Sequence, residues 1–376
     1  MKNILVLTQC FCCGSWISIE KILNNLPRHL FGITVIGLGP IKERNSHFRY
    51  IRVPYPEFNR YGSITCKSPV FNFLWNLPLI ILGNFFVLLK RPRAVYYNGL
   101  ATGLIMSPFT KLLGVKNVIM YHTFLGRIGL NKSRLLGFFA KSVDIFVVNS
   151  SGSAKDVAQF ADSRKIVINE HYAEDVFFKT NIKSTGFKND NFCVSYVGRI
   201  DEDKLCFPLI EAISVLGEVC GIEFKFAGGG SAISRVVDLS KKYRNVHYLG
   251  YIDSRKKLAD FYSSSDVLWT TGNETYLCLP AIESLACGTP IIVPKESEVR
   301  DTDGRRKIVD PSLVPSKIGW LIDVNDVRKI ADTLLNIKEA KVSMSQRLAC
   351  RRYADEHYSI KNISKVVSRL ESLHEK

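Results

Sequence analysis

Short apolar runs alternate with longer amphipathic stretches along both halves of this chain, and this pattern predicts its secondary structure. In the first half, buried strands are predicted at 4–8, 33–36, 94–97, 118–121 and 145–148, with helices between them such as 15–25. In the second half, strands are predicted at 194–197, 224–227, 246–249, 267–269 and 291–293, and helices at 206–217, 231–243, 254–263 and 327–338. Such alternation is typical of α/β folds with a doubly wound parallel sheet, here one in each half.

The polar segment 179–190, which contains Gly186, predicts a linker between the two halves. We therefore expect a first domain at 1–182 and a second domain at 183–355. A helix predicted at 360–373 would occupy the closing segment, 356–376. With 376 residues, the chain is long enough for two domains of ordinary size.

Two apolar segments of the first half stand beside basic residues. The segment 68–89 carries no charge and is followed by Lys90 and Arg91. Because Pro78 divides it and asparagines interrupt it, a helix is predicted only at 79–89, which is too short to span a membrane. The segment 133–141 places Leu and Phe beside Arg and Lys. Both segments are typical of helices that lie in a membrane interface, and the alternative is a pair of ordinary core-facing helices.

The charge of the chain is unevenly spread. The formal net charge is +16, and residues 1–183 hold 23 Lys and Arg against 9 Asp and Glu, a net of +14. The remaining residues hold 28 against 26, a net of +2. Between Glu57 and Asp144 there are eleven basic residues and no acidic one. A positive field attracts a membrane leaflet or nucleic acid. Since no nucleic-acid-binding motif is present, an anionic membrane surface is the expected partner, with a solvated basic face as the alternative.

The beginning of the chain and its cysteines indicate an intracellular setting. Residues 2–7 predict a strand rather than a signal peptide, because the apolar run is short and no cleavage site follows; we expect a cytoplasmic protein. The ten cysteines are then expected to be reduced thiols. Cys10 and Cys13 have C-x-x-C spacing, but no second pair or histidine cluster joins them, so no metal site is predicted. The first strand is not followed by G-x-G-x-x-G, which disfavours a dehydrogenase.

The segment 272–290 carries the most specific chemistry. Pro280 suits the first turn of a helix, and Gly288 with Pro290 ends it before the buried strand predicted at 291–293. A helix N-terminus offers backbone N–H groups to an anion, and carboxylates accept hydrogen bonds from hydroxyls. With Glu274 and Glu283 nearby, the segment is suited to a ligand that has a phosphate end and a polyhydroxyl end.

Four upstream segments join this one in a recognisable order. They are Val197-Gly198-Arg199-Ile200-Asp201 with Lys204 five residues after the Arg, Phe226-Ala227-Gly228-Gly229-Gly230, Val246–Ile252 and Tyr262–Val267. From about 195 to 293, the chain resembles the family 4 retaining glycosyltransferases, GT-B enzymes of the glycosyl transferases group 1; the first half matches loosely. One spacing departs from the family pattern. Glu274 and Glu283 are nine positions apart instead of eight, and Thr275 stands at the strict spacing, so either a bulge near Leu277 restores Glu274 or its role is altered.

The resemblance implies a fold, an activity and a donor. The implied fold is GT-B: two Rossmann-like doubly wound domains facing a cleft, with the last helix packing back on the first domain. The implied activity is that of a hexosyltransferase-type glycosyltransferase (EC 2.4) that uses a UDP- or GDP-sugar, without a metal or another cofactor. We expect a front-face retaining reaction, in which a diphosphate oxygen helps to deprotonate the acceptor.

The resemblance also implies residue roles. In the donor site, Arg199 and Lys204 would neutralise the diphosphate. Glu283 would accept hydrogen bonds from the ribose, and Glu274 or Thr275 would contact the transferred sugar. The remaining implied positions are the amides of Tyr276, Leu277, Cys278 and Leu279 at the β-phosphate, Gly228, Gly229 and Gly230 beside the nucleotide, Ile252 with Tyr251 at the base, Gly14 near the donor phosphate and acceptor, and His122 at the transferred sugar.

Together these expectations describe a peripheral enzyme at the cytoplasmic membrane face. It would move a sugar to a lipid-linked glycan acceptor in surface polysaccharide assembly. The alternatives are a glycosyltransferase acting on a soluble or glycolipid acceptor, and a catalytically silent GT-B scaffold protein.

Overall fold

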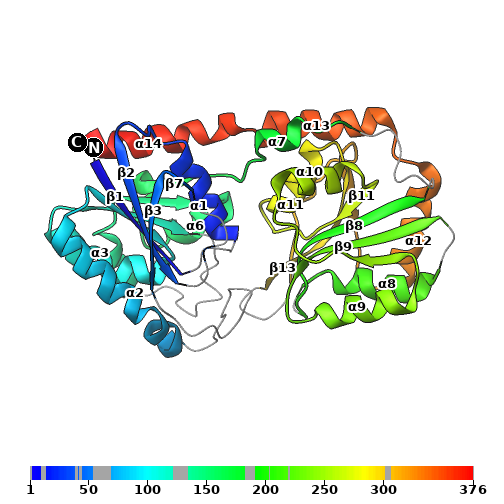
Figure 1. Ribbon diagram of the computed structural model, residues 1–376, viewed down its shortest axis with the longest axis horizontal. Helices are drawn as coiled ribbons and strands as arrows, with labels where there is room; N and C mark the ends of the chain where they lie inside the picture. Colours follow the sequence, from blue (N-terminus) through cyan, green and yellow to red (C-terminus); the bar gives the residue numbers. More distant parts are fainter. Residues whose placement is uncertain are drawn as a thin grey trace. The chain divides into compact units, whose positions relative to one another are not determined.

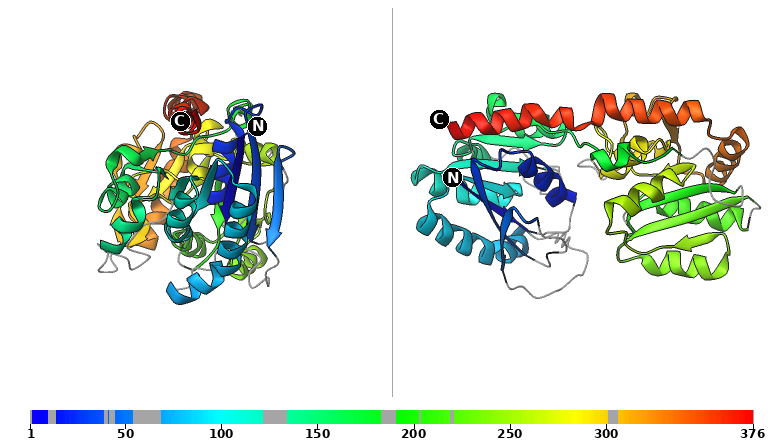
Figure 2. Two further views of the ribbon diagram at one scale, coloured as in Figure 1. Left: turned by 90° about the vertical axis from the view of Figure 1, so that its left-hand side faces the viewer. Right: turned by 45° about the horizontal axis from the view of Figure 1, so that its top comes forward.

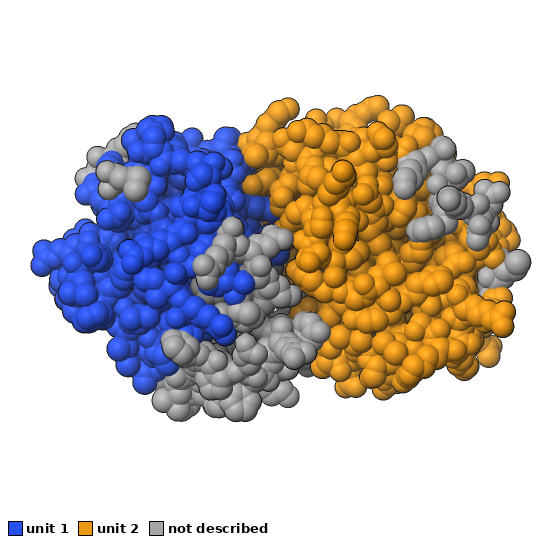
Figure 3. Space-filling view, viewed as in Figure 1, with its two compact units in different colours: residues 1–170, 363–376 blue, residues 171–362 orange. Residues whose placement is uncertain are grey.

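The computed structural model describes residues 2–9, 14–38, 41, 45–53, 69–121, 134–182, 191–202, 204–218, 221–300 and 306–375. The chain divides into two compact units, residues 1–170 with 363–376 (unit 1) and residues 171–362 (unit 2) (Figure 1, Figure 3). The division after Glu170 precedes the polar segment at which the sequence predicts a linker. Its physical reason is α7 (Asp175–Phe178), whose Phe177 is fully buried against Tyr262 of unit 2.

In the described part of unit 1, seven parallel strands form one sheet in the order β3-β2-β1-β4-β5-β6-β7. The strands are β1 (Lys2–Thr8), β2 (Phe31–Leu38), β3 (Phe48–Val53), β4 (Ala94–Asn98), β5 (Lys116–Tyr121), β6 (Ile145–Val148) and β7 (Ile166–Ile168). The five predicted strands are confirmed. Sequence reasoning missed β3 and β7, which lie at the two edges of the sheet. Polar residues interrupt the apolar ones in β3, and the residues of β7 are half-buried or exposed.

Helices cover both faces of this sheet. On one face lie α2 (Pro69–Lys90), α3 (Leu100–Leu112), α5 (Arg134–Ala140) and α6 (Ser151–Ala158), which share a core with Leu5, Tyr97 and Phe146. On the other face lie α1 (Gly14–Asn24) and α14 (Ser364–Glu375), and Figures 1 and 2 show α14 on the side of the sheet opposite α2 and α3. This two-sided covering is the doubly wound arrangement.

The helix α2 is longer than the sequence predicts. It runs without interruption over Pro69–Lys90, with Pro78 inside it, whereas a helix was predicted only at 79–89. A proline removes one backbone hydrogen bond, but tertiary packing stabilises most helices in proteins. Here Asn76, Leu79 and Ile80 flank the proline and are buried, so packing offsets the loss. Within the described residues, no helix is both long and apolar enough to cross a membrane.

The closing helix α14 is anchored in unit 1. It follows the short 3-10 helix η3 (Ile360–Ile363), and its Val366 and Leu370 are fully buried. Near its end, the Tyr96 hydroxyl lies 3.0 Å from His374 Nε2, and Lys2 Nζ donates to the carbonyl of His374 at 2.7 Å. Burial, and then the charges of Lys2 and Arg93, lower the pKa of His374 to about 4. The imidazole is therefore neutral at pH 7, and it joins the C-terminal helix to the first strands of the chain.

In the described part of unit 2, six parallel strands form a second sheet in the order β10-β9-β8-β11-β12-β15. They are β8 (Phe192–Arg199), β9 (Ile222–Gly229), β10 (Val246–Tyr248), β11 (Val267–Trp269), β12 (Ile291–Pro294) and β15 (Gly319–Ile322). All five predicted strands are confirmed. Sequence reasoning missed β15 and the antiparallel pair β13 (Glu296–Arg300) and β14 (Arg306–Ile308).

The helices of unit 2 also fall into two groups. One core joins α8 (Phe207–Leu216), α9 (Ile233–Lys242) and α12 (Val327–Ala340) to the sheet. The other joins α10 (Arg255–Ser263), α11 (Leu279–Ala286) and α13 (Met344–Tyr358). Sequence reasoning did not predict α13, and a buried ion pair holds it: Arg347 NH2 lies 2.8 Å from Asp266 Oδ1. Asp266 precedes β11, so α13 is tied directly to the edge at which that strand begins.

Candidate functional site

The order of the strands in unit 2 defines where a ligand is expected. From β8 the chain winds to β9 and β10 on one side, and it then returns to form β11 on the other side. In open parallel sheets, ligands bind outside the carboxyl ends of the strands where this reversal occurs. The reversal lies between β8, which ends at Arg199, and β11, which is followed by residues 270–278. The topology therefore brings the predicted Arg loop and the predicted Glu loop to one edge.

Arg199 is held at this edge by Asp201. The Arg199 guanidinium lies 2.7 Å from Asp201 Oδ2, and the Arg199 side chain is 41% exposed. The other Asp201 oxygen accepts hydrogen bonds from the backbone N–H and the hydroxyl of Ser231, at 2.7 and 3.0 Å. The Asp201 carbonyl accepts from the backbone N–H of Lys204 at 2.9 Å. Asp201 thus organises the loop that presents both predicted cations, a role that sequence reasoning did not assign to it.

Gly228 and Gly230 allow two loops to pack closely. Gly228 lies opposite Gly198 in the β8–β9 register, with φ +138°. A Cβ on Gly228 would lie 1.9 Å from the Gly198 carbonyl oxygen, and one on Gly230 would lie 2.2 Å from that of Ile200. No side chain can be accommodated at either position, since both neighbours are backbone atoms. The two glycines therefore set the shape of the loop that carries Arg199, whether or not Gly229 also approaches a nucleotide.

The loop after β11 is a tight hairpin that leads into α11. Gly272 and Leu277 form an antiparallel bridge, and the N–H of Asn273 donates to the carbonyl of Tyr276 at 3.2 Å. Leu277 is fully buried and anchors this turn in the core. Cys278 then precedes α11, which has a proline in its first turn as predicted. The N–H of Ile282 donates to the carbonyl of Cys278, which is the first hydrogen bond of the helix. The N–H groups that precede Ile282 in α11 have no acceptor within the helix, and such groups at a helix N-terminus are suited to bind anions.

Glu274 and Thr275 are the central residues of this turn, and their surroundings differ. Glu274 Oε2 lies 2.6 Å from Lys307 Nζ on β14, and the Glu274 carbonyl accepts from the N–H of Asp310 at 3.1 Å. Thr275 is half-buried, and its Oγ1 is a buried atom with no hydrogen-bond partner. Glu274 and Thr275 thus share a tight turn in which Lys307 pairs with the carboxylate of Glu274.

Glu283 lies in a buried polar cluster. Its side chain is 4% exposed, and Tyr262 donates its hydroxyl to Oε2 at 3.2 Å. Arg255 lies 3.5 Å from Oε1 of Glu283 and 3.6 Å from Oε1 of Glu174. Burial and the neighbouring carboxylate of Glu283 raise the pKa of Tyr262 well above its ordinary value, so this hydroxyl stays a donor. A ribose hydroxyl that reaches Glu283 would therefore join an existing network.

Ile252 lines an open pocket of about 460 Å³ together with Leu249, Tyr251 and Phe261. Phe261 and Tyr262 are adjacent residues of α10, and their ring centroids lie 6.2 Å apart. Ile252 itself is half-buried and packs against the core that contains Glu283's helix. Tyr251 and Ile252, the two positions expected at the base, thus line the same pocket.

Several predicted groups fall at the limits of the described residues. His122, Cys10 and Cys13 lie outside them, and Gly14 is the first residue of α1. The cysteines that the structure describes are not disulfide-bonded; they are Cys193, Cys206, Cys278, Cys287 and Cys350. Burial raises the pKa of Cys193 to about 12, so that thiol is unreactive. In the part of the chain that the structure describes, no group of three or more His, Cys, Asp or Glu side chains could hold a metal.

The structure adds partners that sequence reasoning missed: Asp201, Glu174, Arg255, Tyr262 and Lys307. Asp201 stands inside the recognised loop motif, so its position was a usable signal. Lys307 is 33 residues from Glu274 on a separate hairpin, and no spacing along the sequence could have identified it.

Comparisons with known proteins find a family match and a curated relative. Residues 177–357 match the family described as glycosyl transferases group 1, and this segment contains the whole edge described above. A curated relative, the GDP-mannose-dependent alpha-(1-6)-phosphatidylinositol dimannoside mannosyltransferase of Mycobacterium tuberculosis, is 30% identical over 110 residues. That alignment covers 28% of this chain and 28% of the relative's length.

Solved structures resemble nearly the whole chain. The Anabaena protein HepE in complex with UDP has a TM-score of 0.68 and 13% identity, covering 99% of this chain and 100% of HepE. A sucrose-phosphate synthase from Thermosynechococcus elongatus has a TM-score of 0.71 and 15% identity, covering 99% and 98%. These likenesses show the fold: the GT-B fold, with two Rossmann-like halves, is confirmed. The family match further supports an enzyme of the expected hexosyltransferase type (EC 2.4).

Proposed function

Because residues 177–357 match the glycosyl transferases group 1, we propose that this chain is a retaining glycosyltransferase of family 4. It transfers a sugar from a nucleoside-diphosphate sugar to a lipid-linked glycan at the cytoplasmic membrane face, in surface polysaccharide assembly. The observation that carries the proposal is the edge of the unit 2 sheet between β8 and β11. There an organised arginine loop, a glycine turn and a helix N-terminus meet at the point where α/β sheets bind ligands.

The reaction demands stabilisation of a leaving diphosphate. The bond between the anomeric carbon and the diphosphate oxygen breaks, and a bond to the acceptor oxygen forms on the same face. The acceptor proton passes to the departing diphosphate oxygen. Arg199 and Lys204, with the first amides of α11, supply positive charge and N–H donors where negative charge develops. No metal or other cofactor is required in this proposal.

The donor is a UDP- or GDP-sugar. Support comes from the curated mannosyltransferase, which is GDP-mannose-dependent, and from HepE, which was solved with UDP. Ile252 would contact the base and Glu283 the ribose, each from a core-anchored position.

The acceptor is a lipid-linked glycan. Support comes from the basic first half of the chain, whose net charge of +14 up to residue 183 favours an anionic surface. The curated relative is named for a phosphatidylinositol dimannoside, which is also lipid-borne.

Transfer assays with purified protein test the proposal. Incubation with GDP-mannose or UDP-glucose and a membrane-lipid extract is expected to release the nucleoside diphosphate and form a glycolipid with the donor's anomeric configuration. The Arg199→Ala, Lys204→Ala variant is expected to lose turnover. An inverted product would contradict retention. Nucleotide binding without any turnover, over a panel of donors and acceptors, would instead identify a catalytically silent scaffold.

A further inference from the structure

The helix α2 is apolar on its outward face as well as on its inward face. Inward, Leu79 and Val87 are fully buried against the sheet of unit 1. Outward, Ile81, Phe85 and Leu89 recur at helical spacing and are exposed, with Phe85 57% accessible. A surface helix of a globular protein normally carries polar residues on its outer side. The outer side of α2 therefore calls for a partner.

The neighbouring helices extend this apolar face. α2 packs beside α3, and α3 packs beside α5, on the same face of the sheet. Leu112 at the end of α3 is 87% exposed, and Leu135 and Phe138 on α5 are 62% and 64% exposed. We call the outward side chains of these helices the three-helix surface; its main members are Ile81, Phe85, Leu89, Leu112, Leu135 and Phe138. Contiguous apolar patches on soluble proteins mark sites that bind other proteins or membranes.

Basic residues border the three-helix surface at one end. α2, α3 and α5 all cross between parallel strands of one sheet, so their C-terminal ends lie at the same edge. Lys90 is the last residue of α2 and Arg91 follows it, and Lys141 follows the end of α5; all three are exposed. No acidic residue stands between Glu57 and Asp144 in the sequence. Asp144, which lies at the same edge, is paired with Lys111, so the exposed charges of the border are positive.

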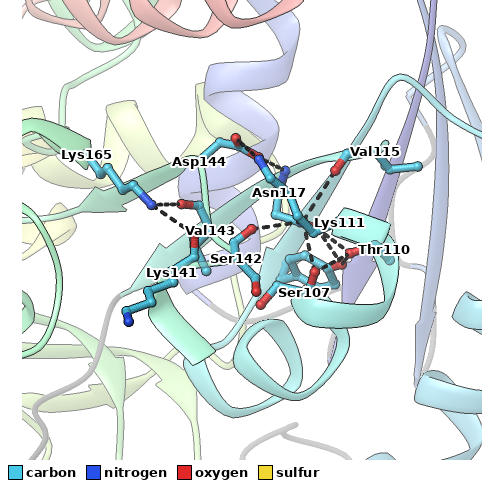
Figure 4. A network of polar contacts seen from close by, with 11 residues as sticks. Ser107, Thr110, Lys111, Val115, Asn117, Lys141, Ser142, Val143, Asp144 and Lys165 are labelled. Atoms are coloured by element: carbon cyan, nitrogen blue, oxygen red, sulfur yellow. Dashed lines mark hydrogen bonds and ion pairs between the residues drawn. The ribbon is translucent and has the colours of Figure 1, made fainter. Parts of the chain in front are cut away.

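A buried polar network fixes the end of α3 in place (Figure 4). Thr110 donates its hydroxyl to Asn117 Oδ1 at 2.6 Å, and the Asn117 amide donates to the carbonyls of Ser107 and Ser142 at 3.2 Å. Lys111 pairs with Asp144 at 2.6 Å, whereas Figure 4 shows the Lys141 side chain directed away from the network. The exposed Leu112 is the last residue of α3 and directly follows Lys111 of this network.

We propose that the three-helix surface docks unit 1 on an anionic lipid bilayer. Its apolar side chains enter the boundary between headgroups and acyl chains, and Lys90, Arg91 and Lys141 contact the anionic headgroups. This inference rests on the proposed function for the membrane-borne acceptor. A second copy of the chain would bring the same positive border to the contact, whereas anionic headgroups neutralise that charge.

Vesicle co-sedimentation tests the docking. The wild-type chain is expected to sediment with vesicles of phosphatidylcholine containing about one-third phosphatidylglycerol, and at least about tenfold less with pure phosphatidylcholine. The variant Ile81→Gln, Phe85→Gln, Leu89→Gln is expected to bind at least about tenfold more weakly, since the apolar contribution scales with buried area. The matched control is Val215→Gln, Leu348→Gln, two exposed apolar residues of unit 2, and it is expected to bind as the wild type does.

Two further readouts keep the outcome interpretable. Stabilisation by GDP or UDP is measured for each variant, so a retained nucleotide response with no vesicle binding by the wild type would overturn the docking alone. If GDP and UDP do not stabilise the wild type, that result would instead count against the proposed function. Sedimentation velocity without lipid must show a monomer. A dimer that the triple variant dissolves would assign the surface to a second copy and contradict the proposal.

Discussion

The two halves of the chain have similar folds but differ in where the residues that we assign to binding lie. In unit 2 they lie at the sheet edge between β8 and β11, and they are held by buried or half-buried ion pairs. In unit 1 they lie on the outer faces of helices, as exposed apolar and basic side chains. The first 183 residues carry a net charge of +14 and the remainder +2. Similar folds thus carry a polar cluster at a sheet edge in one half and exposed apolar and basic helix faces in the other.

This contrast explains why the two halves differ in their resemblance to known proteins. The family match covers residues 177–357, all of which lie in unit 2. Under the proposed function, the residues around a diphosphate and a ribose are constrained by the contacts that these groups need. A lipid surface requires only apolar area and charge, which many sequences supply.

The largest expected effect on stability comes from breaking the buried ion pair between Arg347 and Asp266 in unit 2. Arg347→Met leaves the buried carboxylate of Asp266 without its partner, and breaking a buried ion pair in this way typically costs about 3–5 kcal/mol. We expect the thermal transition of unit 2 to fall sharply. The double variant Arg347→Met, Asp266→Asn keeps an acceptor for the N–H of Cys193 and removes the charge, so it is expected to recover part of the loss. Equal melting temperatures for wild type and Arg347→Met would show that the pair contributes little.

Removing the cations at the donor edge is expected to have the next largest effect. Arg199→Ala, Lys204→Ala should lower kcat/KM by about 10²–10³-fold, the range found when preorganised donors to a developing charge are deleted. Lys241→Ala, an exposed lysine on α9, is the matched control and should leave turnover unchanged. A wild-type rate in the double variant would place the diphosphate elsewhere.

The pH dependence of unit 1 tests the anchoring of α14. The pKa of His374 is lowered to about 4 by burial, from the ordinary value of 6.5, so the folded state favours the neutral ring. Stability from this residue is complete above about pH 6.5 and is lost as the pH falls towards 4. The loss is about 2–3 kcal/mol, at about 1.4 kcal/mol for each pKa unit. Melting temperatures of unit 1 measured from pH 7 to pH 4.5 check this, and His374→Phe should flatten that part of the curve.

The smallest expected effect concerns Glu274 and Lys307. Their side chains are 40% and 35% exposed, and ion pairs of this kind contribute about 0–1 kcal/mol to stability. Lys307→Met should therefore leave the melting temperature nearly unchanged. If Lys307 orients Glu274 towards the sugar, the KM for the donor should rise a few-fold, and Glu274→Gln should show the same change. An altered KM in Glu274→Gln alone would mean that Glu274 acts without Lys307.

Much of this fold follows from hydrophobic periodicity. The ten predicted strands are present, and Pro280 and Gly288 bound the helix that they indicate. What could not be predicted depends on tertiary packing. The full length of α2 is supported by burial around Pro78, and the edge strands β3 and β7 are stabilised by pairing with a neighbour rather than by an apolar run.

The site was predictable as a set of segments and not as a set of contacts. The motif that contains Arg199 also contains Asp201. Only the structure shows that one Asp201 oxygen pairs with Arg199 and the other accepts from the N–H of Ser231. Arg255 and Lys307 reach Glu283 and Glu274 from α10 and β14, and their positions in the sequence carry no hint of it. The apolar segments of unit 1 indicated a membrane interface, whereas the contribution of Leu112 on α3 required the fold.

The central claim is that the sheet edge of unit 2 binds a nucleoside diphosphate. Thermal stabilisation by UDP, GDP, ADP, dTDP and CMP tests it most directly, because a ligand that binds the folded state raises the melting temperature by mass action. We expect a shift with UDP or GDP that is lost in the Arg199→Ala, Lys204→Ala variant and kept in Lys241→Ala. No shift with any of these nucleotides, or a shift that survives in the double variant, would contradict the claim.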